Sequence, residues 1–344
     1  MKKLLLLAAF VIVLLVLFTA CSGDDTAGAV DENRPHAGRR LVVYTTTRPE
    51  FHDPLLAPFI EETGIQLEFM NAGAGELLSR IRAEAANPIA DVMLGGLLAT
   101  TSAHMDLFED FRSIHEPQII ENFRNSEGML TRFQHQGSVL IVNTELIGDI
   151  QINGYADLLN PALRGRIAMT DPSASGSAFD HLVNKLYAMG GGNPHAGWGF
   201  VEDFMDNVNG IILGSSSAVI RGVADGEFVV GLTFEEGPMP YIEGGAPVKM
   251  VYMEEGVIFG AGGVYIVRST QNMDIAELFV NFVLSQPAQL MMEETLHRRS
   301  VRSDVVADGL LLPLSDINVI YADTDYVAYN RDEWLDMFMD IMTR

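Results

Sequence analysis

Four short polar stretches follow apolar segments and carry the side chains best suited to bind a small molecule. They combine hydroxyl groups, one guanidinium, glycines and a carboxylate. Because hydroxyl, guanidinium and backbone N–H groups all donate hydrogen bonds, the combination favours an anion. The residues are Thr45, Thr46, Thr47 and Arg48 in the first stretch, Gly95 and Gly96 in the second, Ser173, Ser175, Gly176 and Ser177 in the third, and Thr233 and Glu235 in the fourth.

The third stretch has the most specific pattern for an anion site. It leads into a predicted helix that begins near Ala178, and the N–H groups at a helix N-terminus attract negative charge. Asp180 and His181 follow in that helix and are further candidate site residues. The simpler interpretation is that Ser175 or Ser177 only caps the helix.

Sequence signatures of enzymes are absent. The chain has no G-x-S-x-G, H-E-x-x-H or P-loop motif. The eight histidines are scattered without metal-ligand spacing, and a single cysteine excludes a cysteine-based zinc site. We therefore expect no catalytic residue, no cofactor and no metal. A hydrolase that uses Ser177 with His181 is the less favoured alternative.

Composition excludes further classes of protein. The 344 residues include 22 basic and 46 acidic side chains, which gives a net charge of -24. Nucleic-acid binding is excluded by this balance, because it needs a basic surface. The length and an apolar fraction of 48% predict two folded domains.

The N-terminus indicates export. An apolar stretch over residues 4–18 is short for a membrane-spanning helix and typical of a signal peptide. Cys21 follows it, which resembles the bacterial lipoprotein signal, although Phe18 stands where that pattern prefers leucine. The resemblance implies removal of residues 1–20, a lipidated Cys21 that anchors the protein to a membrane of the cell envelope, and a flexible tether over residues 21–39. The expected location is the outer face of the cytoplasmic membrane or the periplasm.

The elements that position the polar stretches alternate between strand and helix patterns. Short apolar runs at 41–44, 91–94 and 166–169 predict strands, and apolar residues at helical spacing predict helices such as 179–189. This alternation predicts an α/β fold with parallel sheets flanked by helices. Ligands bind at the carboxyl ends of the strands in such sheets, which is where the four stretches lie.

The alternation restarts near residue 138, which predicts two lobes. We expect lobe 1 to comprise residues 40–137 and 260–344, and lobe 2 to comprise residues 138–259. Each lobe is then a mostly parallel sheet flanked by helices, and two crossing strands join them. Glycines in the second crossing suit either a hinge or tight turns; they are Gly256, Gly260, Gly262 and Gly263.

Several blocks of sequence together resemble the extracellular solute-binding proteins of bacterial ABC importers. The similarity is strongest to the ferric-iron, phosphonate and hexose-phosphate branch, which has the type II periplasmic-binding fold. It implies a monomer whose lobes close on a solute and deliver it to a membrane permease and its ATPase. The blocks are LVVYTTT at 41–47, ADVMLGG at 90–96, MTDPSASGSAF at 169–179, VIRGVADGEFVVGLTFEEG at 219–237 and GAPVKMVYMEEG at 245–256.

The resemblance implies a solute class only in part. Ferric-binding members carry two adjacent tyrosines after the strand that corresponds to 228–232, where this chain has Phe234 and Glu235. The tyrosines that bind iron in those members are therefore missing from the corresponding positions of this chain. We expect a phosphorylated sugar or a phosphonate instead, held by Arg48, the threonine hydroxyls and the helix terminus at Ser173–Ser177. Hydrogen bonds from sugar hydroxyls would then be accepted by Asp180, His181 and Glu235.

The acidic composition supports other solutes. A strongly negative surface repels anions at long range and suits a polyamine or a metal cation, with Glu235, Glu236 and Asp180 as counter-ions. Within a site, an arginine and directed N–H groups outweigh a surface field that salt screens over about 8 Å. We favour the anion, and ferric iron or a polyamine remains the alternative.

Overall fold

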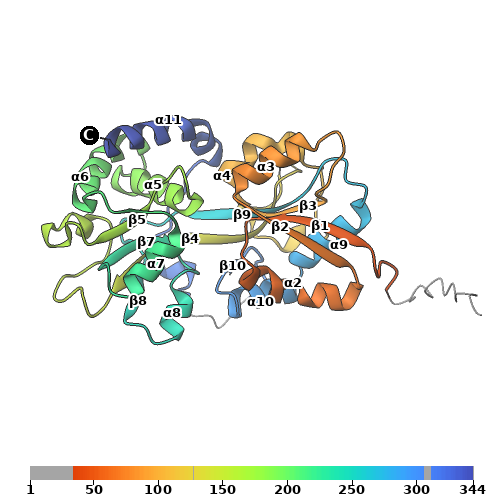
Figure 1. Cartoon of the computed structure of the whole chain (residues 1–344), viewed down its shortest axis with the longest axis horizontal. Helices are drawn as coiled ribbons and strands as arrows, with labels where there is room; N and C mark the ends of the chain where they lie inside the picture. The colour runs from red at the N-terminus through yellow and green to blue at the C-terminus, as the bar shows by residue number, and fades with distance from the viewer. Residues whose placement is uncertain (1–33, 127, 306–310, 344) are drawn as a thin grey trace, which may run out of the picture.

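The computed structural model describes residues 34–126, 128–305 and 311–343, so the predicted signal peptide and Cys21 lie outside the described residues. Two lobes, each a sheet with helices packed on it, lie side by side and are joined by long strands (Figure 1). The sheet order is β2-β1-β3-β9-β4-β7-β5-β6, and the expected two-lobed α/β fold is confirmed. Within the described ranges, no helix has both the length and the apolar content that a membrane span requires.

Lobe 1 begins with the predicted strand-helix alternation. Its strands β1 and β2 are parallel, as are β1 and β3, and helix α2 ends at Gly64, whose φ of 68° suits glycine. The buried faces of these elements form a core separate from that of lobe 2. The elements are β1 (Arg40–Thr45), α2 (Pro49–Thr63), β2 (Gln66–Asn71), α3 (Ala74–Ala83), β3 (Val92–Leu97) and α4 (Leu98–Thr101).

Two antiparallel strands cross between the lobes, close to the positions predicted. Strand β4 (Thr131–Asn143) pairs with β9 (Phe259–Ile266) over its first half and with β7 over its second half. Because β7 belongs to lobe 2, the single strand β4 is part of both sheets. Figure 1 shows β4 and β9 running across the middle of the molecule.

Lobe 2 repeats the α/β arrangement. Strand β5 is parallel to β6 and β7, whereas β4 runs antiparallel to β7 and β8. The helices that follow β5 and β6 both start at the edge facing lobe 1 (Figure 1). The elements are β5 (Ile167–Thr170), α5 (Gly176–Met189), α6 (Trp198–Val208), β6 (Ile212–Leu213), α7 (Ser216–Ala224), β7 (Val230–Phe234), α8 (Met239–Glu243) and β8 (Val248–Val251).

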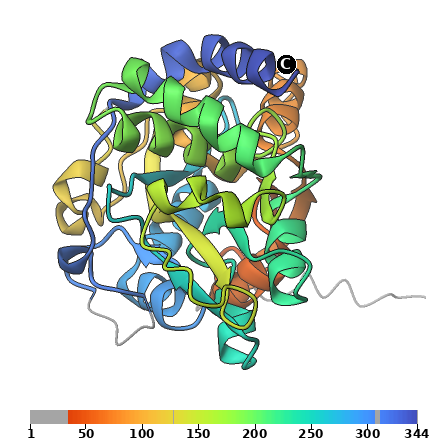
Figure 2. The ribbon, with the colours of Figure 1, turned by 90° about the vertical axis from the view of Figure 1, so that its left-hand side faces the viewer.

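The C-terminal region corrects one predicted boundary. The elements α9 (Met273–Val283), α10 (Gln286–Glu294) and β10 (Arg299–Ser300) pack on lobe 1, whereas the last helix, α11 (Thr324–Met342), buries its apolar face in the lobe 2 core and also contacts α4 of lobe 1. It lies beside α5 and α6 in both views (Figures 1 and 2). Assigning all of 260–344 to lobe 1 was therefore wrong.

The apolar face of α11 explains this packing. Val327, Trp334 and Phe338 lie on one side of the helix and are buried in the core of lobe 2. The chain must therefore cross between lobes a third time, between Val301 in the lobe 1 core and Ile317 in the lobe 2 core. Two crossing strands are present as expected, and the chain between Val301 and Ile317 makes an additional connection between the lobes.

The end of the predicted tether is also more ordered than expected. Nη2 of Arg39 donates to Oδ1 of Asp274 at 2.9 Å, and the N–H of Gly38 donates to the carbonyl of Gly64 at 2.8 Å. Residues 34–39 are therefore docked on lobe 1, and the part of the tether before them lies outside the described residues.

Candidate functional site

A cleft of about 760 Å³ lies between the lobes, at the carboxyl ends of strands from both sheets. The structure brings most of the predicted binding residues to it, as the topology of an open α/β sheet requires. The predicted residues that line the cleft are Thr45, Thr46, Thr47, Arg48, Gly95, Gly96, Ser175, Gly176 and Ser177.

The lobe 1 wall is built by the loops after β1 and β3. Oγ1 of Thr46 accepts a hydrogen bond of 3.0 Å from the N–H of Gly96, which ties the two loops together. Gly95 has a φ of 94°, and a Cβ there would lie 2.2 Å from Oγ1 of Thr46. Only glycine fits this position, because Thr46 approaches the backbone of β3 too closely for a side chain.

The lobe 2 wall carries three serine hydroxyls that contact one another. Oγ of Ser177 lies 2.7 Å from Oγ of Ser216, and Oγ of Ser175 lies 3.0 Å from Ser216 and 3.1 Å from Ser177. Ser175 and Ser177 lie at the start of α5, and Ser216 begins α7. Two helix N-termini, each with partial positive charge, therefore meet at this serine cluster (Ser175, Ser177 and Ser216).

Ser216 and Ser217 are cleft residues that the sequence analysis did not predict. The structure divides the roles: Ser215 is the N-cap, with its Oγ accepting from the N–H of Ala218, whereas Ser216 and Ser217 line the cleft. The run of three serines at the start of a predicted helix could have indicated a binding role. The sequence does not show, however, that α7 lies beside α5.

Charge in the cleft comes from two arginines and one glutamate. Nη2 of Arg48 donates to Oε1 of Glu236 at 3.4 Å, and Arg298 forms an ion pair with Oε2 of the same carboxylate. Arg298 also stacks on Phe51, with its guanidinium carbon 3.9 Å from the ring centroid. Two positive charges and one negative charge leave this group with one net positive charge, which favours an anionic solute.

Glu235 does not line the cleft, and its predicted role as a solute ligand is not supported. Its side chain is 1% exposed and accepts hydrogen bonds from the N–H of Gly137 at 2.8 Å, the hydroxyl of Tyr252 at 2.8 Å and Nη2 of Arg299 at 2.7 Å. Glu235 therefore joins the crossing strand β4, the end of β8 and the segment after α10. Glu235 thus forms a structural ion pair with Arg299, and its neighbour Glu236 is the residue that faces the cleft.

His181 and Thr233 are also buried outside the cleft. Nδ1 of His181 lies 2.7 Å from the Tyr155 hydroxyl and Nε2 lies 2.6 Å from the carbonyl of Thr233. Burial, with a smaller contribution from Lys185, lowers the pKa of His181 to about 3, so the ring is neutral. With both nitrogens used in this way, His181 is not paired with Ser177, which argues against the hydrolase alternative.

Two further predicted residues lie elsewhere. Ser173 is exposed in the turn before α5, where its N–H donates to Oδ1 of Asp171 at 2.7 Å. Asp180 lines a separate cavity on the other side of Leu97. Neither residue is among those that line the cleft.

Several cleft residues had no signal that we recognised in the sequence. Gln134 and Gln136 project from the same face of β4, because they are two residues apart on a strand. Asn71, at the end of β2, adds a third amide. Amide groups both donate and accept hydrogen bonds, so they suit the hydroxyl groups of a sugar.

Metal ligation has little support in this part of the molecule. Among the residues that the structure describes, the cleft lining contains no tyrosine, histidine or cysteine, and its one carboxylate belongs to Glu236. Across residues 34–126, 128–305 and 311–343, no group of three His, Cys, Asp or Glu side chains is placed to hold a metal ion.

Comparison with known proteins agrees with this architecture. Residues 55–312 match the family model for bacterial extracellular solute-binding proteins. Iron uptake protein A1 of Synechocystis sp. is 28% identical over 305 residues, which is 84% of this chain and 82% of that protein. The periplasmic binding protein AfuA from Actinobacillus pleuropneumoniae, solved with exogenous fructose-6-phosphate bound, is 26% identical, with a TM-score of 0.80 over 89% of this chain and 99% of that one.

A more distant structure supports the fold alone. The ferric binding protein from Campylobacter jejuni is 19% identical, with a TM-score of 0.74 over 88% of this chain and 99% of that one. The two lobes, the crossing strands and the interlobe cleft thus agree with a family match that spans most of the sequence. The chain belongs to the family of bacterial extracellular solute-binding proteins and has the type II periplasmic-binding fold.

Proposed function

We propose that this protein is the solute-binding component of an ABC importer and that it captures a small phosphorylated compound, a sugar phosphate or a phosphonate. The observation that carries the proposal is the serine cluster, where three hydroxyls and two helix N-termini meet in the cleft. Arg48 and Arg298 from lobe 1 add positive charge to the same cleft.

The size and remaining chemistry of the cleft favour a sugar phosphate over inorganic phosphate. A cleft of about 760 Å³ has room for a body much larger than one phosphate group. Gln134, Gln136 and Asn71 supply amides for hydroxyl groups on such a body. The similarity to AfuA, solved with fructose-6-phosphate bound, supports the same class.

Ferric iron is the second candidate, because one of the similar proteins is named as an iron uptake protein. The chemistry of the lining counts against direct ligation of iron by tyrosines, since no tyrosine is among the described residues that line the cleft. A polyamine is disfavoured because Glu236, the one carboxylate among the described residues of the lining, is already paired with two arginines.

The cellular context follows from the family and from the N-terminus. We propose that the mature protein begins at a lipidated Cys21, acts as a periplasmic or membrane-anchored monomer, and delivers its solute to a permease and an ATPase. Its role is transport, without chemistry on the solute. Residues 21–33 would then connect the anchor to lobe 1.

A panel of solutes tests the ligand class. Thermal shift and calorimetry with glucose 6-phosphate, fructose 6-phosphate, 2-aminoethylphosphonate, phosphate, ferric citrate and spermidine should show saturable stabilisation by a phosphorylated or phosphonate compound. Ser216→Ala should weaken that binding by about 10–100-fold, because hydrogen bonds to charged groups contribute about 1.5–3 kcal/mol. Ser173→Ala, outside the cleft, is the matched control.

Two outcomes would contradict the proposal. Stabilisation by ferric citrate alone, or by spermidine alone, would assign the protein to a different solute class. Equal effects of Ser216→Ala and Ser173→Ala on phosphate-compound binding would remove the serine cluster from the site.

A further inference from the structure

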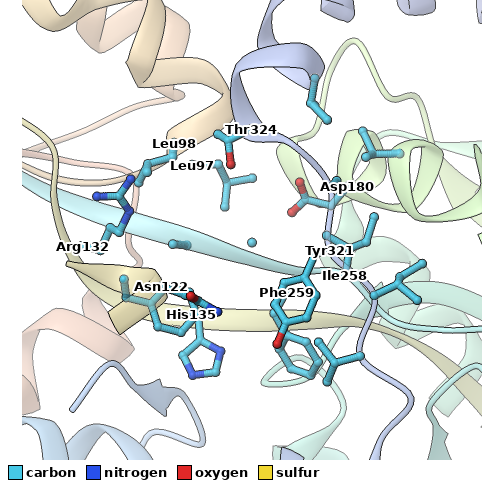
Figure 3. Close-up of a pocket in the computed structure, with 18 of the residues that line it drawn as sticks. Leu97, Leu98, Asn122, Arg132, His135, Asp180, Ile258, Phe259, Tyr321 and Thr324 are labelled. Carbon is cyan, nitrogen blue, oxygen red and sulfur yellow. The ribbon is translucent and has the colours of Figure 1, made fainter. Parts of the chain in front are cut away.

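A second cavity, of about 270 Å³, lies at the junction of the lobes and is distinct from the solute cleft. On β4, Gln134 and Gln136 line the cleft, whereas His135 lines this cavity, so the two spaces lie on opposite faces of the strand. Leu97 borders both spaces and separates them. Figure 3 shows the cavity between the crossing strands and the segment that leads into α11.

The carboxylate of Asp180 points from α5 into this cavity (Figure 3). Among the described residues it has no hydrogen-bond or ion-pair partner. A Cβ on Gly260 of β9 would lie 3.4 Å from Oδ2 of Asp180, so the carboxylate reaches the backbone of the crossing strand. Burial raises the pKa of Asp180 to about 7, because the charged form loses its hydration.

The surroundings of Asp180 are mostly apolar and aromatic. Ile258 and Phe259 lie beside it, and Tyr321 comes from the segment between Ile317 and α11 (Figure 3). Val183 comes from the next turn of α5. At the far end, Arg132 donates to the carbonyls of Arg124 at 2.9 Å and Leu130 at 3.2 Å. The cavity thus combines an apolar wall with one carboxylate that has no partner within the described part of the chain.

We propose that this cavity binds a small organic amine, with its ammonium group on Asp180 and its apolar part against Ile258 and Phe259. A carboxylate facing an apolar space is costly unless a donor pairs with it, and an ammonium supplies both the donor and the opposite charge. The faces of aromatic rings also attract cations. The volume is several times the roughly 30 Å³ that a water molecule occupies, so the site has room for an organic group.

Binding here would be coupled to the solute cleft. The lining comes from both lobes, from β4 and β9 and from the segment before α11, so an occupant stabilises this arrangement of the lobes. By linkage, an amine that favours the solute-bound arrangement raises solute affinity, and the solute raises amine affinity by the same factor. The amine site is separate from the proposed solute function and does not depend on it.

Calorimetry with benzylamine tests the proposal, with benzyl alcohol and benzoate as neutral and anionic analogues of similar shape. We expect saturable binding of benzylamine and much weaker binding of both analogues. Asp180→Asn should weaken benzylamine binding by about 10–100-fold, since it removes a charge-assisted hydrogen bond. Asp203→Asn, an equal charge change on the exposed face of α6, should leave it unchanged.

Three results would overturn the proposal: no saturable benzylamine binding, equal binding of benzyl alcohol, or unchanged binding in Asp180→Asn. If Asp180→Asn fails to fold, Ile258→Trp fills the cavity from another element and should abolish amine binding. Titration of Ile258→Trp with glucose 6-phosphate measures solute binding in the cleft independently of amine binding. A failed amine site is thereby distinguished from a failed solute site.

Discussion

Glu236 at the end of β7 in lobe 2 accepts a hydrogen bond of 3.4 Å from Nη2 of Arg48, which follows β1 in lobe 1. The same carboxylate pairs with Arg298, also in lobe 1, so one acidic side chain connects two arginines across the cleft. This ion pair connects the two lobes and occupies the charges that a bound anion would use. An anionic solute must share the two arginines with Glu236 or displace it.

Neutralising Glu236 should therefore loosen the arrangement of the lobes in the absence of solute. We expect Glu236→Gln to increase the radius of gyration in small-angle scattering, and added solute to reverse the increase, because the solute replaces the lost contact. Glu227→Gln, an exposed change in the same lobe, is the control. An unchanged radius in solute-free Glu236→Gln would show that the ion pair does not hold the lobes.

Removing the Arg48 guanidinium should weaken solute binding. A charge-assisted hydrogen bond contributes about 1.5–3 kcal/mol, so Arg48→Ala is expected to raise the dissociation constant by about 10–100-fold. Calorimetry at low and high salt measures this, and the control is Arg164→Ala on the exposed surface of lobe 2. Equal affinities in the two variants would exclude Arg48 as an anion ligand.

Breaking the buried pair of Glu235 and Arg299 should destabilise the fold. Their side chains are 1% and 6% exposed, and loss of one partner leaves the other charge buried without compensation. Glu235→Gln should lower the free energy of unfolding by about 3–5 kcal/mol in urea denaturation. A loss no larger than that of Glu227→Gln would contradict the structural role of this pair.

The buried histidines predict a loss of stability in acid. Burial lowers the pKa of both His135 and His181 to about 3, against 6.5 for the exposed ring. Between these values the unfolded chain binds protons that the folded chain does not, so stability is complete above pH 6.5 and falls as the pH drops towards 3. The slope is about 1.4 kcal/mol per pH unit for each histidine.

Replacing one of these rings tests that assignment. Urea denaturation of His181→Gln from pH 7 to pH 4 should show a smaller slope than the parent protein, by about one proton. Asp180, whose pKa is raised to about 7, acts in the opposite direction between pH 4 and 7, because the folded chain holds its proton. An unchanged slope in His181→Gln would mean that His181 titrates normally in the folded protein.

Lipidation of Cys21 is a prediction from the N-terminal sequence. In a bacterial host, the mature protein should carry a diacylglyceryl group on Cys21 by mass spectrometry and fractionate with membranes. Cys21→Ala should abolish the modification and the membrane association. A parent protein that keeps residues 1–20, or that is freely secreted, would refute the anchor.

Local patterns were sufficient for much of the fold and for one half of the cleft. Residues 41–44 and 179–189 show the periodicity of a buried strand and an amphipathic helix, and the structure has β1 and α5 there. Strand ends are also where α/β sheets bind ligands, so the loop over Thr45–Arg48 and the start of α5 were found from sequence position alone.

Tertiary structure decided which neighbouring residues face the cleft. Glu235 and Glu236 are adjacent and chemically alike, but the backbone turns one into a buried ion pair and the other into the cleft. Asp180 and Ser177 are one turn apart on α5, and Leu97 places them in different cavities. The direction of an individual side chain depends on packing partners from distant segments, which no local pattern specifies.

The sequence by itself therefore determined the element types, the two-lobed class and the loops at the strand ends, because these depend on periodicity and on general rules of chain connection. Only the tertiary structure decided that Ser216 completes the serine cluster, that Arg298 joins Arg48 on one carboxylate, and that α11 returns to lobe 2. Each of these contacts joins residues far apart in the chain. Their positions follow from how two cores pack across a shared pair of strands, which is a property of the whole molecule.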